Sequence, residues 1–294
     1  MIVRGDETLL VQGITGKQGS FWTARMQEYG TRVVGGVNPK KAGTECCGVP
    51  VYASAVDAAK SGTSFDVSIL FIPPLGVLAA AKDAMQAGCK KLVCLTEHTP
   101  VRDVMFIMAE ARERGVQIVG PNTAGLVTPG ECFVGFMPAF DSTIFKPGNI
   151  GVISRSGSLG TLMCLNIVQA GYGQSAFSGI GGDPIIGTTT RDALVALDED
   201  DRTEAVVLVG EIGGSMEEAA AEYAQTMQKP LVAAYIAGGS SPPGKKMGHA
   251  GAIVMGDKGT YQSKKIALEK AGVEVLATPS AIGAALDNSG VDKV

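Results

Sequence analysis

Short apolar segments alternate with helix-like segments along the whole chain, and this alternation restricts the fold more than any other feature. In the first half, apolar runs of strand length occupy residues 9–12, 32–37, 67–72, 91–95 and 117–119. Helical patterns lie between them at residues 21–29, 55–60, 75–87 and 101–114. Continuous apolar strands separated by helices are typical of a parallel sheet that helices cover on both faces. The first half therefore predicts a Rossmann-like α/β domain.

The second half repeats the same alternation. We expect strands at residues 150–153, 174–177, 205–209, 231–236 and 273–276, and helices at 161–170, 189–197, 216–227 and 261–271. Residues 238–251 form a loop rich in Gly, Pro, Lys and Ser. The stretch 128–148 is also loop-like, because it carries Pro129, Gly130, Pro138, Pro147 and Gly148. We therefore predict one domain at 1–127, a linker at 128–148 and a second parallel-sheet domain at 149–294.

Composition and charge exclude several classes of function. The net charge is −4 without any block of Lys or Arg, which argues against nucleic acid as a partner. The longest apolar stretch, residues 67–81, is interrupted by Pro73 and Pro74 and is too short to span a membrane. The spacing of the six cysteines fits neither a zinc site nor a disulfide framework. We expect free thiols in a reducing compartment, and thus a cytoplasmic protein.

A glycine-rich turn follows the first predicted strand. It reads Gly13-Ile14-Thr15-Gly16-Lys17-Gln18-Gly19 and leads into a helix, whose free N–H groups can bind phosphate. A dinucleotide-binding domain would place an acidic residue after the second strand to bind a ribose hydroxyl. Here Asn38 and Pro39 are followed by Lys40 and Lys41. This disfavours NAD and favours a ligand with more phosphate, such as coenzyme A.

The chain has only two histidines, His98 and His249. His98 follows a strand, where ligands of α/β proteins bind, and His249 lies between glycines in the 238–251 loop. Glu211 follows another strand, and a carboxylate beside an imidazole fixes its tautomer and raises its basicity. The segment Ser154-Arg155-Ser156-Gly157-Ser158-Leu159-Gly160 opens a helix and forms a second candidate anion site. Together these residues indicate a transient phosphohistidine.

Other catalytic patterns do not fit. Ser156 does not lie in the Gly-x-Ser-x-Gly turn of a serine hydrolase. The chain contains no GxxxxGK[ST] phosphate loop, so we expect no nucleoside triphosphate site of that kind. The two histidines are not accompanied by clustered acids, and we predict no metal site.

Seven motifs together resemble a known family. The chain is similar to the alpha subunits of succinate–CoA ligase (succinyl-CoA synthetase), in the NDP-forming acid–CoA ligase family. The motifs are Gln12-Gly13-Ile14-Thr15-Gly16-Lys17-Gln18-Gly19, Gly35-Gly36-Val37, Gly120-Pro121-Asn122, Ser154-Arg155-Ser156-Gly157, Gly179-Ile180-Gly181-Gly182-Asp183-Pro184, Gly210-Glu211-Ile212-Gly213-Gly214 and Gly248-His249-Ala250-Gly251. Their order along nearly the whole chain makes the resemblance specific.

The resemblance implies an N-terminal CoA-binding Rossmann domain and a C-terminal flavodoxin-like domain. It implies a beta subunit with an ATP-grasp fold that binds ATP or GTP with Mg²⁺, in a heterodimer or heterotetramer. Phosphate would pass from the nucleotide to His249, then to a small acid, and CoA would displace it as a thioester. Glu211 would orient His249, and Ser154, Ser156 and Gly157 would hold the phosphohistidine. If the protein were eukaryotic, the resemblance would also allow the mitochondrial matrix, after processing.

The same resemblance assigns residues to the two substrates. Coenzyme A would contact Thr15, Gly16, Lys17, Gln18, Lys41, Leu95, Thr96 and Glu97. On the acid side the chain departs from the succinate pattern, with Thr123-Ala124 in place of Cys-Pro and Thr161 in place of a tyrosine. We therefore expect a different small acid, with malate, citrate and the sulfonated acid sulfoacetate as alternatives. Two other classes stay open: a non-catalytic CoA-binding protein and an NAD-dependent oxidoreductase.

Overall fold

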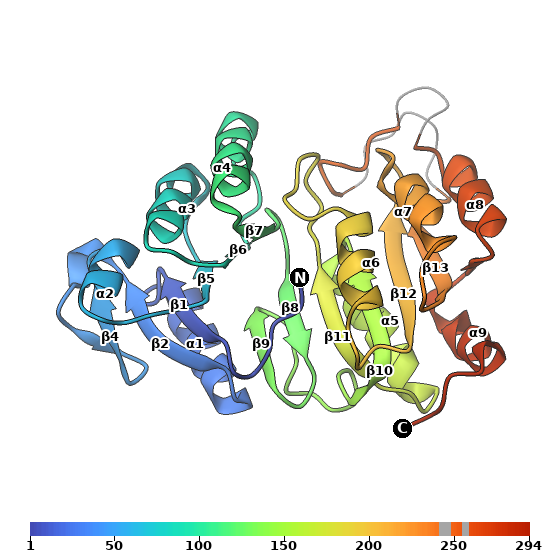
Figure 1. Cartoon of the computed structure of the whole chain (residues 1–294), viewed down its shortest axis with the longest axis horizontal. Coiled ribbons are helices and arrows are strands. Elements are labelled where there is room, and N and C mark those ends of the chain that lie inside the picture. Colours follow the sequence, from blue (N-terminus) through green and yellow to red (C-terminus); the bar gives the residue numbers. More distant parts are fainter. Residues whose placement is uncertain (241–247, 255–258) are drawn as a thin grey trace.

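The computed structural model describes residues 1–240, 248–254 and 259–294. These residues form two α/β domains that lie side by side, with the amino terminus between them (Figure 1). Residues 241–247 of the expected 238–251 loop lie outside the described residues. Among the described residues, no helix is both long and apolar enough to cross a membrane.

The first domain is built on a seven-stranded sheet with the spatial order β3-β4-β2-β1-β5-β6-β7. All neighbours in it are parallel except β3 and β4. Without β3, the strands follow the order 3-2-1-4-5-6 that characterises Rossmann domains, which confirms the predicted fold. Its strands are β1 (Thr8–Gln12), β2 (Arg32–Val37), β3 (Glu45–Cys46), β4 (Val49–Tyr52), β5 (Val67–Leu70), β6 (Lys91–Cys94) and β7 (Gln117–Val119).

Helices cover both faces of this sheet. Three of them pack side by side on one face: α2 (Ala55–Lys60), α3 (Val77–Gln86) and α4 (Val101–Arg114). The other face is covered by α1 (Lys17–Tyr29). Two short 3₁₀ helices, η1 (Pro39–Lys41) and η2 (Pro74–Gly76), follow β2 and β5.

Gly13 explains why a glycine turn must follow β1. Its φ of 80° is left-handed, and a Cβ there would lie 2.3 Å from the carbonyl oxygen of Phe71. One turn into α1, a Cβ on Gly19 would lie 2.2 Å from the carbonyl oxygen of Gly13. The two glycines therefore bring the start of α1 against the end of β1, where helix N–H groups face the strand ends.

The second domain also has a seven-stranded sheet, in the order β14-β13-β12-β10-β11-β8-β9. Its five parallel strands follow the 2-1-3-4-5 order of flavodoxin-like folds, as the resemblance implied. These are β10 (Pro147–Ser154), β11 (Gln174–Gly179), β12 (Ala205–Glu211), β13 (Leu231–Ala237) and β14 (Glu274–Val275). One face carries α6 (Thr190–Asp198), α7 (Met216–Ala224) and α8 (Tyr261–Lys270), and the other α5 (Gly157–Gln169), η3 (Pro279–Ala281) and α9 (Ile282–Ser289).

The prediction of a linker over residues 128–148 was wrong for the start of this stretch. Part of it forms an antiparallel hairpin, β8 (Gly125–Thr128) and β9 (Cys132–Gly135), and β8 pairs with β11. The second sheet therefore begins before residue 128, inside the range we expected for the first domain. The strands are only four residues long and lie beside Pro129 and Gly130, so the turn residues concealed them.

The hairpin joins the two domains through a shared core. Phe133 of β9 contacts Trp22 and Tyr29 of α1, with ring centroids 6.5 and 5.5 Å apart. Buried residues of both sheets form one continuous apolar cluster, which includes Val11 and Phe177. The two strand systems are therefore fixed against one another by packing rather than by a flexible connection.

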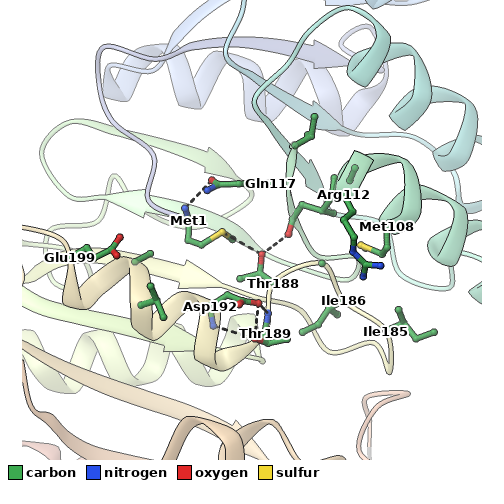
Figure 2. A pocket seen from close by; sticks show the side chains of 16 residues that line it. Met1, Met108, Arg112, Gln117, Ile185, Ile186, Thr188, Thr189, Asp192 and Glu199 are labelled. Carbon is green, nitrogen blue, oxygen red and sulfur yellow. Dashed lines mark hydrogen bonds between the residues drawn. The ribbon is translucent and has the colours of Figure 1, made fainter. Parts of the chain in front are cut away.

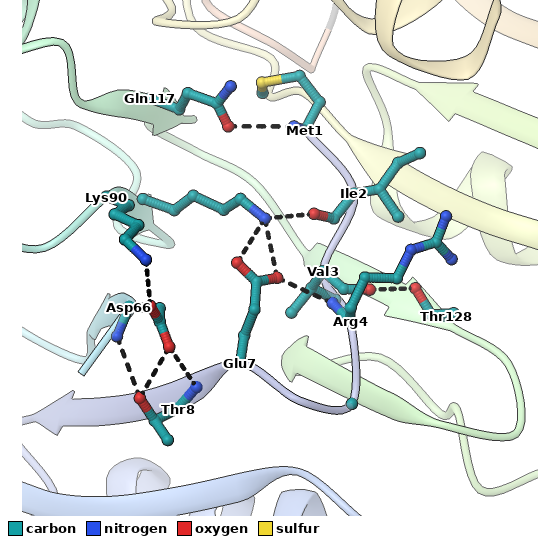
Figure 3. Close-up of polar contacts among 12 residues, drawn as sticks. Met1, Ile2, Val3, Arg4, Glu7, Thr8, Asp66, Lys90, Gln117 and Thr128 are labelled. Atoms are coloured by element: carbon teal, nitrogen blue, oxygen red, sulfur yellow. Dashed lines mark hydrogen bonds and ion pairs between the residues drawn. The ribbon is translucent and has the colours of Figure 1, made fainter. Parts of the chain in front are cut away.

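Residues 1–7 cross between the domains as a short strap (Figure 3). The Lys91 ammonium group donates to both carboxylate oxygens of Glu7 at 2.8 Å and to the carbonyl of Ile2 at 2.5 Å. Thr128 of β8 donates its hydroxyl to the carbonyl of Val3. The strap thus hydrogen-bonds to a strand of each sheet.

Two helices begin earlier than the sequence pattern indicated. Helix α1 starts at Lys17 instead of residue 21, and α5 starts at Gly157 instead of residue 161. In both cases the glycine-rich turn itself forms the first helical turn. Helix α9, whose eight residues follow the last predicted strand, was not predicted from the sequence.

Candidate active site at the carboxyl edges of the two sheets

The two residues expected to carry phosphotransfer meet in the structure. Glu211 ends β12, and His249 reaches it from the segment 248–254. The Nδ1 atom of His249 lies 2.6 Å from Oε2 of Glu211. A carboxylate accepts but does not donate, so Nδ1 carries the proton and Nε2 keeps a lone pair. Within the described part of the chain, Nε2 forms no hydrogen bond.

Arg155 places a buried positive charge on the other oxygen of Glu211. Its Nη2 lies 3.1 Å from Oε1, and only 2% of the residue is exposed. The carboxylate therefore lies between a guanidinium and an imidazole. Nε and Nη1 of Arg155 have no hydrogen-bond partner among the described residues. The arginine compensates the charge of Glu211, which is otherwise costly to bury.

The pKa of His249 reflects these neighbours. The hydrogen bond to Glu211 raises this pKa, burial opposes the rise, and the negative charge of Glu211 adds to it. The charges of Arg155 and Glu97 have smaller, opposite effects. Phosphorylation needs the neutral ring, so the raised pKa predicts that reactivity falls as pH drops through it.

A glycine makes room for the imidazole. A Cβ on Gly182 would lie 2.5 Å from Nδ1 of His249 and 2.6 Å from Cγ. The neighbouring Asp183 accepts a hydrogen bond from the Asn122 side chain at 3.0 Å, and burial raises its pKa. Asn122 also donates its N–H to the carbonyl of Thr96 at 3.2 Å. This residue therefore connects the end of β6 in the first domain to the histidine site in the second.

The predicted anion-binding turn opens α5 beside the histidine. Ser156 caps the helix, with its hydroxyl accepting from the N–H of Leu159 at 3.4 Å. Ser154 is buried and donates to the carbonyl of Ser156 at 2.6 Å, which fixes the turn. A cavity of about 150 Å³ contains Ser156, Glu211 and His249 in its lining. Gly157 is the first residue of α5, so the free N–H groups of that helix begin at this turn.

A larger cavity of about 850 Å³ lies at the ends of β1, β2 and β5. Of the eight residues expected to contact coenzyme A, Thr15, Gly16 and Lys41 line it. Asn38, which stands where a dinucleotide site would have an acid, donates to the Thr15 hydroxyl at 2.5 Å. This bond joins the ends of β1 and β2. The cavity has the size of a small-ligand site.

The other five expected CoA contacts lie outside the lining of that cavity. Lys17 and Gln18 form the first turn of α1. Leu95, Thr96 and Glu97 follow β6, where the Thr96 hydroxyl donates to the carbonyl of Ile72 at 2.6 Å. The charge of Glu97 contributes to the pKa of both Asp183 and His249, so this turn faces the histidine site. All eight CoA contacts, including those of Thr15, Gly16 and Lys41, stay predictions.

His98 completes the turn after β6. It adopts a left-handed backbone with φ of 62°, which non-glycine residues rarely adopt. Its Nε2 lies 3.8 Å from Oε1 of Glu97.

The two residues expected to face the acid differ in how deeply they are buried. Thr123 is 2% exposed, and its hydroxyl donates to the carbonyl of Gly179 at 2.5 Å and accepts from the N–H of Gly125 at 3.0 Å. Thr161 is half-buried in α5 and donates to the carbonyl of Gly157 at 2.8 Å. Both hydroxyls are therefore committed to backbone groups, and each residue contributes shape rather than a free donor.

A third cavity, of about 690 Å³, lies between the domains (Figure 2). It is lined by α4 and β7 on one side and by residues 185–189 and α6 on the other. None of the expected site residues lines it. Among the described residues, His, Cys, Asp and Glu also form no cluster of three that could hold a metal ion.

Three contributors to the site were not predicted from the sequence. Arg155, Gly182 and Asn122 were each identified only as parts of motifs. Their roles depend on side chains that come together from different strands. The signal in the sequence was their position directly after predicted strands, since the carboxyl ends of parallel strands meet at one edge.

Comparison with known protein families agrees with this division into two domains. Residues 5–98 match the family model of the CoA binding domain, and residues 153–274 match that of the CoA-ligase. The cavity lined by Thr15 and Lys41 lies in the first match, and Glu211 and His249 lie in the second.

Several relatives match nearly the whole chain. The alpha 2 subunit of an ADP-forming succinate–CoA ligase from Archaeoglobus fulgidus is 48% identical, over 95% of this chain and 96% of its own. A subunit of an ADP-forming sulfoacetate–CoA ligase from Acholeplasma sp. is 44% identical, over 98% of this chain and 97% of its own.

A solved structure shows the same fold. ATP citrate lyase from Methanothrix soehngenii, in complex with citrate and coenzyme A, superimposes with a TM-score of 0.89 at 22% identity. The match covers 100% of this chain, which spans about half (52%) of that longer one. Because these relatives are 44–48% identical to this chain over nearly its full length, the chain belongs to the CoA-ligase alpha-subunit family, as the motifs indicated.

Proposed function

We propose that this chain is the alpha subunit of an ADP-forming acid–CoA ligase in which His249 carries a phosphoryl group. One observation carries the proposal: Glu211 lies 2.6 Å from Nδ1 of His249, which leaves the lone pair on Nε2. Nε2 would attack the terminal phosphorus of a nucleoside triphosphate, and the bond to the diphosphate would break. Glu211 would stabilise the positive charge that develops on the ring.

The next two steps move the phosphate from nitrogen to the acid. A carboxylate oxygen of the acid attacks the phosphorus, the N–P bond breaks, and Nε2 regains its lone pair. The sulfur of coenzyme A then attacks the acyl carbon, loses its proton, and inorganic phosphate leaves. An acyl phosphate is a much better acylating agent than a carboxylate, so the histidine divides one difficult reaction into easier ones.

The nucleotide site belongs to a partner in this proposal. The cavity at His249 is about 150 Å³, too small for a nucleoside triphosphate. We propose a beta subunit with an ATP-grasp fold that holds ATP or GTP with Mg²⁺ and forms a heterodimer or heterotetramer with this chain. The relatives named as ADP-forming ligases favour ATP. A cytoplasmic location is part of the same proposal.

Intact-mass measurement tests phosphorylation directly. The chain, purified with its partner, is incubated at neutral pH with and without magnesium nucleotide. We expect a mass gain of one phosphate that acid removes and that the His249→Ala variant lacks. An unchanged mass with a partner that binds nucleotide would contradict the ligase proposal and support a non-catalytic CoA-binding protein.

The acid-side residues motivate a second proposal, that the acid is not succinate. Thr123 and Thr161 replace the cysteine and tyrosine of the succinate pattern, and both hydroxyls bond to backbone groups. Sulfoacetate, malate and citrate are the candidates. The phosphorylated chain, mixed with CoA and each acid, should lose its phosphate fastest with the natural substrate. Succinate reacting as fast as the best of these acids would exclude this proposal.

A further inference from the structure

A buried ion pair lies directly behind Glu211. Lys264 of α8 and Glu217 of α7 are both 0% exposed. The Lys264 ammonium group donates to Glu217 at 2.5 Å, to Glu218 at 2.9 Å and to the carbonyl of Gly214 at 3.1 Å. All three protons of the ammonium group therefore have an acceptor, as a buried charge requires.

The carboxylate of Glu217 contacts the backbone of Glu211. Its Oε1 accepts the N–H of Glu211 at 3.2 Å. A Cβ on Gly210 would lie 2.7 Å from Cγ of Glu217, so the preceding glycine allows the side chain this close. The ion pair therefore holds both ends of the turn from Glu211 to Gly214.

Lys264 belongs to the helix that follows the histidine segment. Just before this helix, Gly259 accepts the N–H of Gly213 at 2.7 Å. A Cβ on Gly213 would lie 2.5 Å from the carbonyl oxygen of Gly251 and from the nitrogen of Ile253. The glutamate turn and the histidine segment thus pack backbone against backbone, and the pair between α7 and α8 joins the two helices that follow them.

We propose that Glu217 and Lys264 are positioning residues for His249: by joining α7 to α8, they hold Glu211 at hydrogen-bonding distance from the imidazole. The inference rests on the proposed phosphorylation of His249. A buried ion pair adds little net stability over apolar residues of the same volume. Glu217 accepts a hydrogen bond from the backbone N–H of Glu211, and apolar residues in place of the pair could not make this bond.

Two variants test the role of the pair. Glu217→Asp keeps the charge but draws the carboxylate back by one methylene, away from the N–H of Glu211. The double variant Glu217→Gln with Lys264→Met removes both charges together, so that neither remains buried alone. In each we expect His249 to gain phosphate about tenfold more slowly, because the bond from Glu211 to Nδ1 loosens.

The pH dependence separates positioning from a general structural role. The charged groups that face His249 are Glu211, Arg155, Glu97 and Asp183, and both variants retain them. A looser bond from Glu211 leaves the imidazole less basic, so the acidic limb of the phosphorylation rate should move to lower pH. Loss of active protein would reduce the rate equally at every pH.

Lys91→Met provides a matched control. Lys91 begins β6 and forms a half-buried ion pair with Glu7, at the end of the strand opposite to the histidine site. We expect wild-type rate and pH dependence in this variant. The midpoint of thermal unfolding and co-purification with the partner, measured for every variant, report whether the chain is folded.

The positioning role would be overturned if either variant of the pair kept the wild-type unfolding midpoint and was phosphorylated with wild-type rate and pH dependence. Failure of the wild-type chain itself to gain phosphate would instead overturn the proposed function. If the charge-neutral double variant does not fold, Glu217→Asp alone decides, since it keeps a negative charge facing Lys264.

Discussion

The carboxyl edges of both sheets are formed by the ends of parallel strands, but the two edges present different chemical groups. At the first edge, the lining of the cavity of about 850 Å³ includes glycines, hydroxyl groups, exposed lysines and apolar side chains such as Phe71. At the second, the buried carboxylate of Glu211, the half-buried His249 and Ser156 line a cavity of about 150 Å³ together with apolar residues. Strands, helices and glycine turns prepare both edges for anions. Of the two edges as described, the second brings an ionisable side chain, His249, into contact with a buried carboxylate.

This difference separates binding from covalent chemistry. Backbone N–H groups and exposed lysines can hold a phosphate, and they tolerate small shifts of the ligand. A phosphoryl carrier needs one nitrogen with a defined tautomer and a charged partner at a fixed distance. We therefore expect substitutions at the second edge to change rates strongly and substitutions at the first edge to change affinities modestly.

The largest effect is expected from Glu211→Gln. It removes the carboxylate that stabilises the charged ring, and the rate of His249 phosphorylation should fall about 1,000-fold. Because the hydrogen bond to Glu211 raises the pKa of His249, this pKa should drop and the acidic limb should move to lower pH. Rapid-quench phosphorylation between pH 5 and about 9 measures both changes.

Glu199→Gln is the control for that substitution. Glu199 is an exposed carboxylate that lines the cavity between the domains. Its loss should leave the rate and its pH dependence unchanged. If Glu199→Gln slowed phosphorylation as much as Glu211→Gln, the carboxylate at the second edge would have no special role.

Gly182→Ala should have the next largest effect. The added methyl group would lie 2.5 Å from Nδ1 of His249 and displace the ring, and a shift near 1 Å can cost about 100-fold in rate. Gly248→Ala is the matched control, because a Cβ on this neighbour of the histidine would meet none of the described residues within 4 Å. If both variants were phosphorylated equally fast, the close packing of the imidazole would have no role in the reaction.

Lys41→Ala tests the first edge. Lys41 is exposed at the cavity rim, so its loss should weaken CoA binding only about fivefold and leave phosphorylation of His249 unchanged. Calorimetry with CoA measures the affinity. The control is Lys60→Ala, because Lys60 is an exposed lysine of α2. A loss of phosphorylation in the Lys41 variant would show that the two edges are not separate in function.

The smallest effect is expected at the opposite end of the first sheet, from Asp66→Asn. Lys90 and the N–H of Thr8 lower the pKa of Asp66 to about 2 (Figure 3). This carboxylate therefore stabilises the fold above its unfolded pKa, and the stabilisation is lost as pH falls through 2. The variant should lose about 0.5 kcal/mol of unfolding free energy near pH 7, and the difference should shrink between pH 4 and about 2.

Chemical denaturation at a series of pH values measures this difference. Asp6→Asn, in an exposed position of the strap, is the control. A difference from wild type that stays constant down to pH 2 would contradict the assigned charge effect.

Much of the fold was accessible from the sequence. Strands buried on both faces read as apolar runs, and the helices between them imply parallel pairing. The local pattern was weakest where turn residues dominate: it missed β8 and β9 beside Pro129 and Gly130, and it placed the starts of α1 and α5 four residues late. A glycine turn and a first helical turn have similar composition, so only their contacts distinguish them.

Within the site, the sequence determined the chemical groups: one histidine between glycines, a carboxylate after a strand and a serine-rich helix start. Tertiary structure alone decided their partners. The 2.6 Å contact of His249 with Glu211, the buried charge of Arg155 and the ion pair of Glu217 with Lys264 join residues from separate elements. Local patterns fix which groups are present, but distances between elements follow from packing of the whole core, which no single segment encodes.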